Sequence, residues 1–67
     1  MGLHSVISNC SNERNLRDLL EGFIMNAGSI YFPQSEVDEA IRLCREKFGS
    51  NGENTIRQIL RNHGIKS

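Results

Sequence analysis

The residues that could act as nucleophiles, bases or metal ligands are few and far apart. His4 and His63 lie at opposite ends of the chain, and Cys10 and Cys44 have no histidine or cysteine neighbour at metal-ligand spacing. Nucleophilic catalysis needs a nucleophile, a base and an orienting group together, and structural zinc needs closely spaced ligands. We therefore expect no enzyme activity, no catalytic residues, no metal and no cofactor.

Three acidic residues that are close in sequence suggest a second kind of chemistry, general acid–base catalysis. Glu36, Asp38 and Glu39 fall in the first turn of a predicted helix, where carboxylates complement the positive end of the helix dipole. We interpret them as helix-stabilising charges rather than as a catalytic pair.

A set of amide and guanidinium side chains near the C-terminus has the most specific chemistry. The set occupies positions i, i+3, i+4, i+7 and i+8 of a predicted helix, and so shares one face: Asn54, Arg57, Gln58, Arg61 and Asn62. Arginine pairs bidentately with guanine, and asparagine or glutamine with adenine, in the DNA major groove. None of the five side chains on this face is acidic, so the face suits contacts with DNA bases or phosphates. A purely solvated helix surface is the alternative.

Tyr31 is the second candidate contact residue. It lies in a short segment, residues 29–33, that is predicted to be extended, and it points away from Ile30 and Phe32. Pro33 keeps the residue before it out of the helical region. A half-buried aromatic that closes the core is the alternative role.

Three stretches with helical periodicity must position these side chains. They are predicted over about residues 13–26, 36–48 and 53–63, with Asn12 or Ser11 capping the first. The apolar stripes comprise Leu16, Leu19, Leu20, Phe23 and Ile24 in the first, Val37, Ala40, Ile41, Cys44 and Phe48 in the second, and Ile56, Ile59, Leu60 and His63 in the third.

Glycines mark the predicted ends of the last two helices. Gly49 is expected to stop the second helix. Gly64 follows the third, where Ile65 can fold back onto Leu60 in a Schellman-type contact.

The N-terminal residues 1–11 carry scattered apolar side chains, and we predict a flexible arm or short strand there. Residues 12–67 are predicted to form a single helical domain. The expected fold class is mostly α, a compact three-helix domain with one short extended segment before the second helix.

The amino-acid composition limits the kinds of partner and the cellular location that we expect. The 67 residues include eight basic and eight acidic side chains, for a net charge of zero. This balance argues against a general polyanion binder but permits one local basic face. No apolar run approaches a membrane span, and the start lacks the basic and apolar regions of a signal peptide. Two cysteines are far fewer than disulfide-rich secreted domains carry, so we expect a cytoplasmic, reducing location. Without a long apolar run we also expect no membrane partner.

The small size also bears on assembly. The core of so short a chain rarely supplies more than ~3–5 kcal/mol, and oligomerisation is one remedy. We therefore expect a homodimer, or a module that docks on a larger protein.

The order of features from Ser29 to Leu60 resembles the ribbon-helix-helix family of dimeric DNA-binding repressors. Residues 29–33 are similar to the family's strand, Gly49 to its turn glycine, and Ile56 with Leu60 falls at the family's spacing. The resemblance implies that two chains pair their strands into a ribbon that enters the major groove. Ser29 and Tyr31 would then face bases, and residues 51–54 would hold a phosphate.

Two further similarities share these residues. Residues 55–65 resemble the recognition helix of a helix-turn-helix protein. Phe32-Pro33 and Ile59-Leu60 resemble features of the three-helix, ubiquitin-binding CUE domains.

We expect a small non-enzymatic DNA-binding protein, such as a phage or plasmid repressor or accessory factor. It would contact DNA through the third helix and the 29–32 segment, without a small-molecule substrate. The alternative is a protein–protein interaction module, either a small inhibitor or adaptor or a CUE-like domain, that docks on a larger protein.

Overall fold

Three helices account for most of the chain in a computed structural model, which describes residues 2–27 and 32–65. They are α1 (Leu3–Ser8), α2 (Glu13–Ala27) and α3 (Gln34–Asn62), and the described residues contain no strand. The predicted fold class, a compact and mostly α three-helix domain, is confirmed. The extended segment predicted at 29–33 falls largely outside the described residues. Pro33 itself has an extended ψ of 145° and is the N-cap residue of α3.

Helix α2 matches the first predicted helix and differs from it by one residue at its end. Asn12 is its cap, because the Asn12 Oδ1 atom accepts a hydrogen bond of 2.9 Å from the main-chain nitrogen of Asn15. Leu16, Leu20 and Ile24 are buried along one stripe. Leu19, predicted to belong to that stripe, is instead 40% exposed.

Helix α3 contains the second and third predicted helices, separated by a single residue. Gly49 has φ 75° and ψ −159°, a conformation essentially restricted to glycine, and this confirms its predicted role as a helix stop. We call residues 34–48 the first segment of α3 and residues 50–62 the second segment. Gly52 lets the two segments approach closely, since a Cβ atom there would lie only 2.5 Å from the Cβ of Phe48.

Helix α1 corrects the N-terminal prediction. Residues 3–8 form a helix, not a flexible arm or short strand, and Leu3, Val6 and Ile7 are buried in the common core. Their spacing is helical, but six residues are far too few to form a stable helix in isolation. Contacts with the rest of the fold must therefore stabilise it.

Two charged side chains of α3 hold the ends of α1. The main-chain nitrogen of Leu3 donates to Glu36 Oε1 at 3.0 Å. Lys47 Nζ donates to the carbonyl oxygens of Ile7 and Ser8 at 2.9 and 2.8 Å. An acid at the helix N-terminus and a base at its C-terminus both complement the helix dipole.

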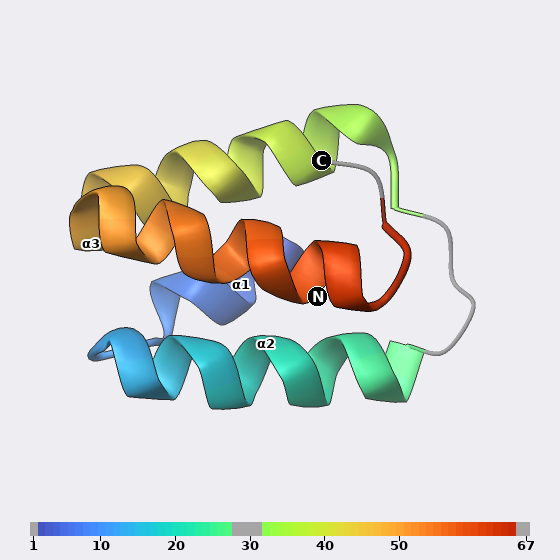
Figure 1. The fold of residues 1–67 in the computed structure, drawn as a ribbon, viewed down its shortest axis with the longest axis horizontal. Helices are drawn as coiled ribbons and strands as arrows, with labels where there is room; N and C mark the ends of the chain where they lie inside the picture. Colours follow the sequence, from blue (N-terminus) through green and yellow to red (C-terminus); the bar gives the residue numbers. More distant parts are fainter. Residues whose placement is uncertain (1, 28–31, 66–67) are drawn as a thin grey trace.

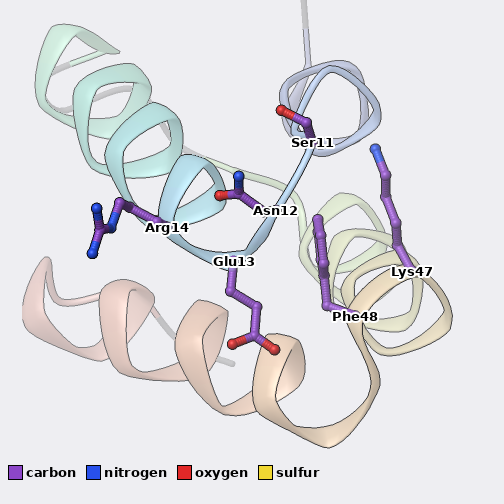
Figure 2. Close-up of a pocket in the computed structure, with 6 residues that line it drawn as sticks. All are labelled: Ser11, Asn12, Glu13, Arg14, Lys47 and Phe48. Carbon is purple, nitrogen blue, oxygen red and sulfur yellow. The ribbon is translucent and has the colours of Figure 1, made fainter.

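The helices pack around one core in a diamond arrangement. In Figure 1 the second segment of α3 crosses in front, between the first segment and α2, while α1 lies behind. Figure 2 likewise places α1, at the upper right, and the second segment of α3, along the bottom, on opposite sides. A surface groove borders the second segment on each side, and we call this segment the ridge.

The C-terminal end of α3 closes as predicted. The main-chain nitrogen of Ile65 donates to the Leu60 carbonyl oxygen at 2.8 Å, and the Ile65 side chain packs partly against the core. This is the Schellman-type contact expected after Gly64.

Candidate nucleic-acid interface

The second segment of α3 carries the predicted contact face on its outer side. Ile56, Ile59 and Leu60 are buried against the core. The opposite side exposes four of the five predicted side chains on this helix, Asn54, Gln58, Arg61 and Asn62, while Arg57 lies at the edge. Tyr31, the sixth predicted site residue, lies outside the described residues.

The amide side chains on the ridge are partly ordered. Gln58 Nε2 donates to Asn62 Oδ1 at 3.1 Å, along the exposed side of the helix. This hydrogen bond orients both amides and uses neither the Gln58 carbonyl oxygen nor the Asn62 amide nitrogen. Those two groups are an acceptor and a donor that a base edge can meet.

A groove of about 410 Å³ runs along one side of the ridge, between the two segments of α3. Its lining includes Arg42 and Arg45 from the first segment, and Arg57 from the second. Two acids, Asp38 and Glu53, also line this groove, so acidic side chains border the predicted acid-free face.

Glu53 holds two of these arginines. Arg57 Nη2 lies 3.0 Å from Glu53 Oε2, and Arg57 Nε donates to the same oxygen at 3.1 Å. Arg45 Nε lies 3.9 Å from the other carboxylate oxygen. The Arg57 side chain is still 43% exposed, so a guanidinium edge remains accessible to a ligand.

A second groove, of about 430 Å³, lies on the other side of the ridge, beside α2. Arg14 and Arg17 line it together with Glu13, Asp18 and the ridge residue Thr55. Arg14 and Arg17 are both exposed.

The chain's six arginines therefore lie on the ridge or line one of the two grooves beside it. Arg57 and Arg61 lie on the ridge helix, Arg42 and Arg45 lie across one groove, and Arg14 and Arg17 lie across the other. Sequence reasoning identified only the pair on the ridge helix. The other two pairs have an i, i+3 spacing, which was a visible signal, but their position beside the ridge depends on helix packing.

A hollow of about 730 Å³ lies where α2 begins beside the end of the first segment of α3 (Figure 2). Lys47 points from it towards α1, and Nζ is occupied by two carbonyl oxygens of that helix. Asn12 is occupied as the α2 cap. Lys47 and Asn12 of this hollow thus hold helices in place.

The two cysteines are buried and free, and burial lowers the reactivity of their thiols. Burial, followed by the neighbouring Cys10, raises the pKa of the Cys44 thiol to about 12, although Lys47 lowers it in part. Burial likewise raises the pKa of the Cys10 thiol. Because the thiolate is the nucleophile and metal ligand, these groups are poor candidates for either role at neutral pH.

Residues 2–27 and 32–65 also contain no group of three or more histidine, cysteine or carboxylate side chains that could hold a metal ion. Within the same part of the chain, no helix has the length and apolar character needed to cross a membrane.

Comparison with known proteins finds no matching family model, curated protein or solved structure. The functional argument therefore depends on the geometry of the chain itself.

Proposed function

We propose that this chain is a small non-enzymatic DNA-binding protein that contacts DNA through the second segment of α3. The observation that supports the proposal most directly is the placement of all six arginines on this ridge and across the two grooves beside it. The role assigned is that of a repressor or an accessory factor of the phage or plasmid type.

The dimensions of the ridge suit the major groove of duplex DNA. The major groove is about 12 Å wide and admits one α-helix, with a phosphate backbone on either side. With the ridge in that groove, the exposed amides of Gln58 and Asn62 face base edges, and Arg61 pairs with guanine or a phosphate. Arg42 and Arg45 approach one phosphate strand, and Arg14 and Arg17 approach the other. Phosphate contacts of this kind fix position, while contacts to base edges give sequence preference.

Binding in this mode requires an exchange of ion pairs. Arg57 and Arg45 share the Glu53 carboxylate, and Arg42 lies 3.8 Å from Glu46. The three arginine side chains are 72%, 73% and 43% exposed, although that of Glu53 is only 23% exposed. Ion pairs with this much solvent contact are worth about 0–1 kcal/mol each, so DNA phosphates can compete for the guanidinium groups. The net charge of zero predicts modest affinity, and the arginine–phosphate contacts predict that the affinity falls as salt rises.

The ribbon-helix-helix resemblance stays a prediction, because the residues similar to that family's strand lie mostly outside the described residues. Within the proposal, Tyr31 and its neighbours would add contacts to those of the ridge. The buried and unpaired thiols support a reducing, intracellular location for the protein.

Fluorescence anisotropy with labelled mixed-sequence duplexes tests the proposal. We expect binding with a dissociation constant of roughly 1–50 μM at about 50 mM salt, and a log–log salt slope of about −3 to −5, as for three to five phosphate contacts. Absence of binding at tens of micromolar protein, or binding without salt dependence, would contradict the proposal.

A second candidate is protein binding by the same ridge, and the engagement of Arg45 and Arg57 by Glu53 favours it. Ion pairs of mixed sign suit a partner protein with its own mixed charges. A purified partner that is retained after nuclease treatment, and is released by Arg57→Ala with Arg61→Ala, would favour this function over DNA binding.

A further inference from the structure

Two amide side chains on the outer side of the ridge are joined by a hydrogen bond. Gln58 Nε2 donates to Asn62 Oδ1 at 3.1 Å, and both side chains are exposed. Because the two residues stand four positions apart on one helix, they are neighbours on a single helix face. The bond therefore orients each amide relative to the other at the surface proposed to meet DNA.

The hydrogen bond leaves one acceptor and one donor unused. It uses an N–H group of Gln58 and the oxygen of Asn62, so the Gln58 Oε1 atom and the Asn62 Nδ2 group remain for a ligand. If both amides turned over, Asn62 would donate to Gln58, and the pair would again leave one oxygen and one NH₂ group. In either orientation the pair presents an acceptor beside a donor.

Adenine is the base whose major-groove edge complements this pattern. It offers the N6 amino group as a donor and N7 as an acceptor, side by side on one base. Guanine offers two acceptors, thymine one acceptor and a methyl group, and cytosine one donor. Against guanine, the free amide oxygen would face an acceptor with no proton between them. An acceptor that loses water without gaining a donor is unfavourable.

We propose that Gln58 and Asn62 act as one unit that recognises adenine, so that the ridge prefers an A·T pair to a G·C pair where these amides face the bases. The adenine N6 amino group donates to Gln58 Oε1, and Asn62 Nδ2 donates to adenine N7. Since the amides already orient each other, less side-chain freedom is lost on binding. The inference rests on the proposed DNA-binding function and adds to it the base that the ridge reads.

A similar pair elsewhere in α3 shows what the second amide contributes. Gln34 Nε2 donates to Asp38 Oδ1 at 3.0 Å, again across four positions on an exposed helix surface. An ionised carboxylate carries no N–H group, so Asp38 offers acceptors and a negative charge where Asn62 offers a donor. Asn62→Asp would give the ridge pair the same character, because it keeps an acceptor for Gln58 and removes the donor.

Fluorescence anisotropy at low salt tests the inference with two labelled duplexes of equal length, one built of A·T pairs and one of G·C pairs. Arg61 can favour guanine independently, so the informative quantity is the change in the A·T-to-G·C affinity ratio on substitution. Asn62→Asp should lower this ratio at least about fivefold, the smallest factor expected for a good bidentate contact. Asn26→Asp adds the same charge at an exposed position beside the groove between α1 and α2, and it should leave the ratio unchanged.

Modified bases show whether the preference comes from the major groove. Inosine keeps the major-groove acceptors of guanine without its minor-groove amino group, and 2,6-diaminopurine keeps the major-groove pattern of adenine with that amino group added. The fall in the ratio caused by Asn62→Asp should persist when inosine replaces guanine and diaminopurine replaces adenine. A fall that disappears in these duplexes would overturn the proposal, because the preference would then come from the minor groove or from DNA flexibility.

A double-mutant cycle tests whether the two amides act as one unit. Gln58→Ala, Asn62→Ala and the double variant should each lower the A·T-to-G·C ratio by nearly the same factor, since losing either amide breaks the shared contact. Additive losses would contradict joint recognition. So would a single variant that keeps the full ratio, because one amide would then suffice.

The proposed function and the adenine preference fail in different ways. No binding to any duplex at tens of micromolar protein would contradict the DNA-binding function and this inference with it. Salt-dependent binding, with an A·T-to-G·C ratio that Asn62→Asp leaves unchanged, would overturn only the adenine preference.

Discussion

Arg57 donates from Nε to Glu53 Oε2 at 3.1 Å, and its Nη2 atom lies 3.0 Å from the same oxygen. The other carboxylate oxygen of Glu53 lies 3.9 Å from Arg45 Nε. One acid therefore links the two segments of α3 and engages two of the arginines proposed to meet phosphates. The balance between this ion pair and a DNA ligand sets the affinity in the proposed mode.

Replacing the Glu53 carboxylate with an amide should strengthen DNA binding. Glu53→Gln removes a negative charge beside the proposed phosphate path and frees Arg45 and Arg57, so we expect about three- to tenfold tighter binding by anisotropy at low salt. Stability should fall by no more than about 1 kcal/mol, because the pairs are partly exposed. Glu39→Gln, an exposed position of α3 that lines neither groove, is the control for net charge. An equal increase in DNA affinity for both variants would show that the effect comes from net charge and not from the position of Glu53 beside the arginines.

Removing the two arginines of the ridge helix should weaken DNA binding and reduce its dependence on salt. Arg57→Ala with Arg61→Ala is expected to make the log–log salt slope shallower by about 1–2, one unit for each lost phosphate contact. Arg57→Lys with Arg61→Lys keeps the charge but loses bidentate geometry. It should preserve the slope and reduce discrimination between duplexes of different sequence. An unchanged salt slope in the alanine variant would show that the ridge does not form part of the DNA interface.

The contact of Lys47 with the end of α1 should matter for stability. Lys47→Met keeps the apolar stem but leaves the carbonyl oxygens of Ile7 and Ser8 without their charged donor. We expect the free energy of unfolding in urea to fall by about 1–3 kcal/mol. Arg42→Met, a comparable change at an exposed helix position, should cost less than about 0.5 kcal/mol. Equal stability of the two variants would contradict the role assigned to Lys47.

The buried thiol of Cys44 predicts a loss of stability in alkali. Burial raises its pKa from 9.0 to about 12, so folding favours the protonated thiol. The resulting stabilisation is fully present below pH 9 and declines as the pH rises from about 9 towards 12. Urea titrations at pH 8, 9 and 10 should show this decline, and Cys44→Ala should show a smaller one. A decline of the same size in that variant would assign the effect to other groups.

Local patterns predicted much of this fold. Leu16, Leu20 and Ile24 repeat at helical spacing over a full-length helix, and Gly49 interrupts the next helical pattern. Helix α2 and the two segments of α3 can therefore be predicted from the sequence. Helix α1 cannot, because six residues cannot establish a period. Its ends are held by Glu36 and Lys47, which lie 33 and 40 residues away in sequence from Leu3 and Ile7.

The candidate site could be predicted only in part, because some of it also depends on contacts between residues that are distant in sequence. The exposed face from Asn54 to Asn62 follows from helical geometry alone. The approach of Arg45 to Glu53, and the position of Arg14 across a groove, follow from how the helices pack. The exposure of Leu19 likewise depends on which arc of α2 meets the core, and sequence spacing alone assigned it to the buried stripe.

The most direct test of the proposed function is to map the DNA-binding face by nuclear magnetic resonance. A ¹⁵N-labelled chain would be titrated with an unlabelled duplex at low salt. We predict that the largest amide and side-chain shifts occur at Asn54, Gln58, Arg61 and Asn62, with smaller shifts at the arginines across both grooves. Shifts confined to α1 and the outer side of α2, or no shifts at saturating duplex, would contradict the proposed function.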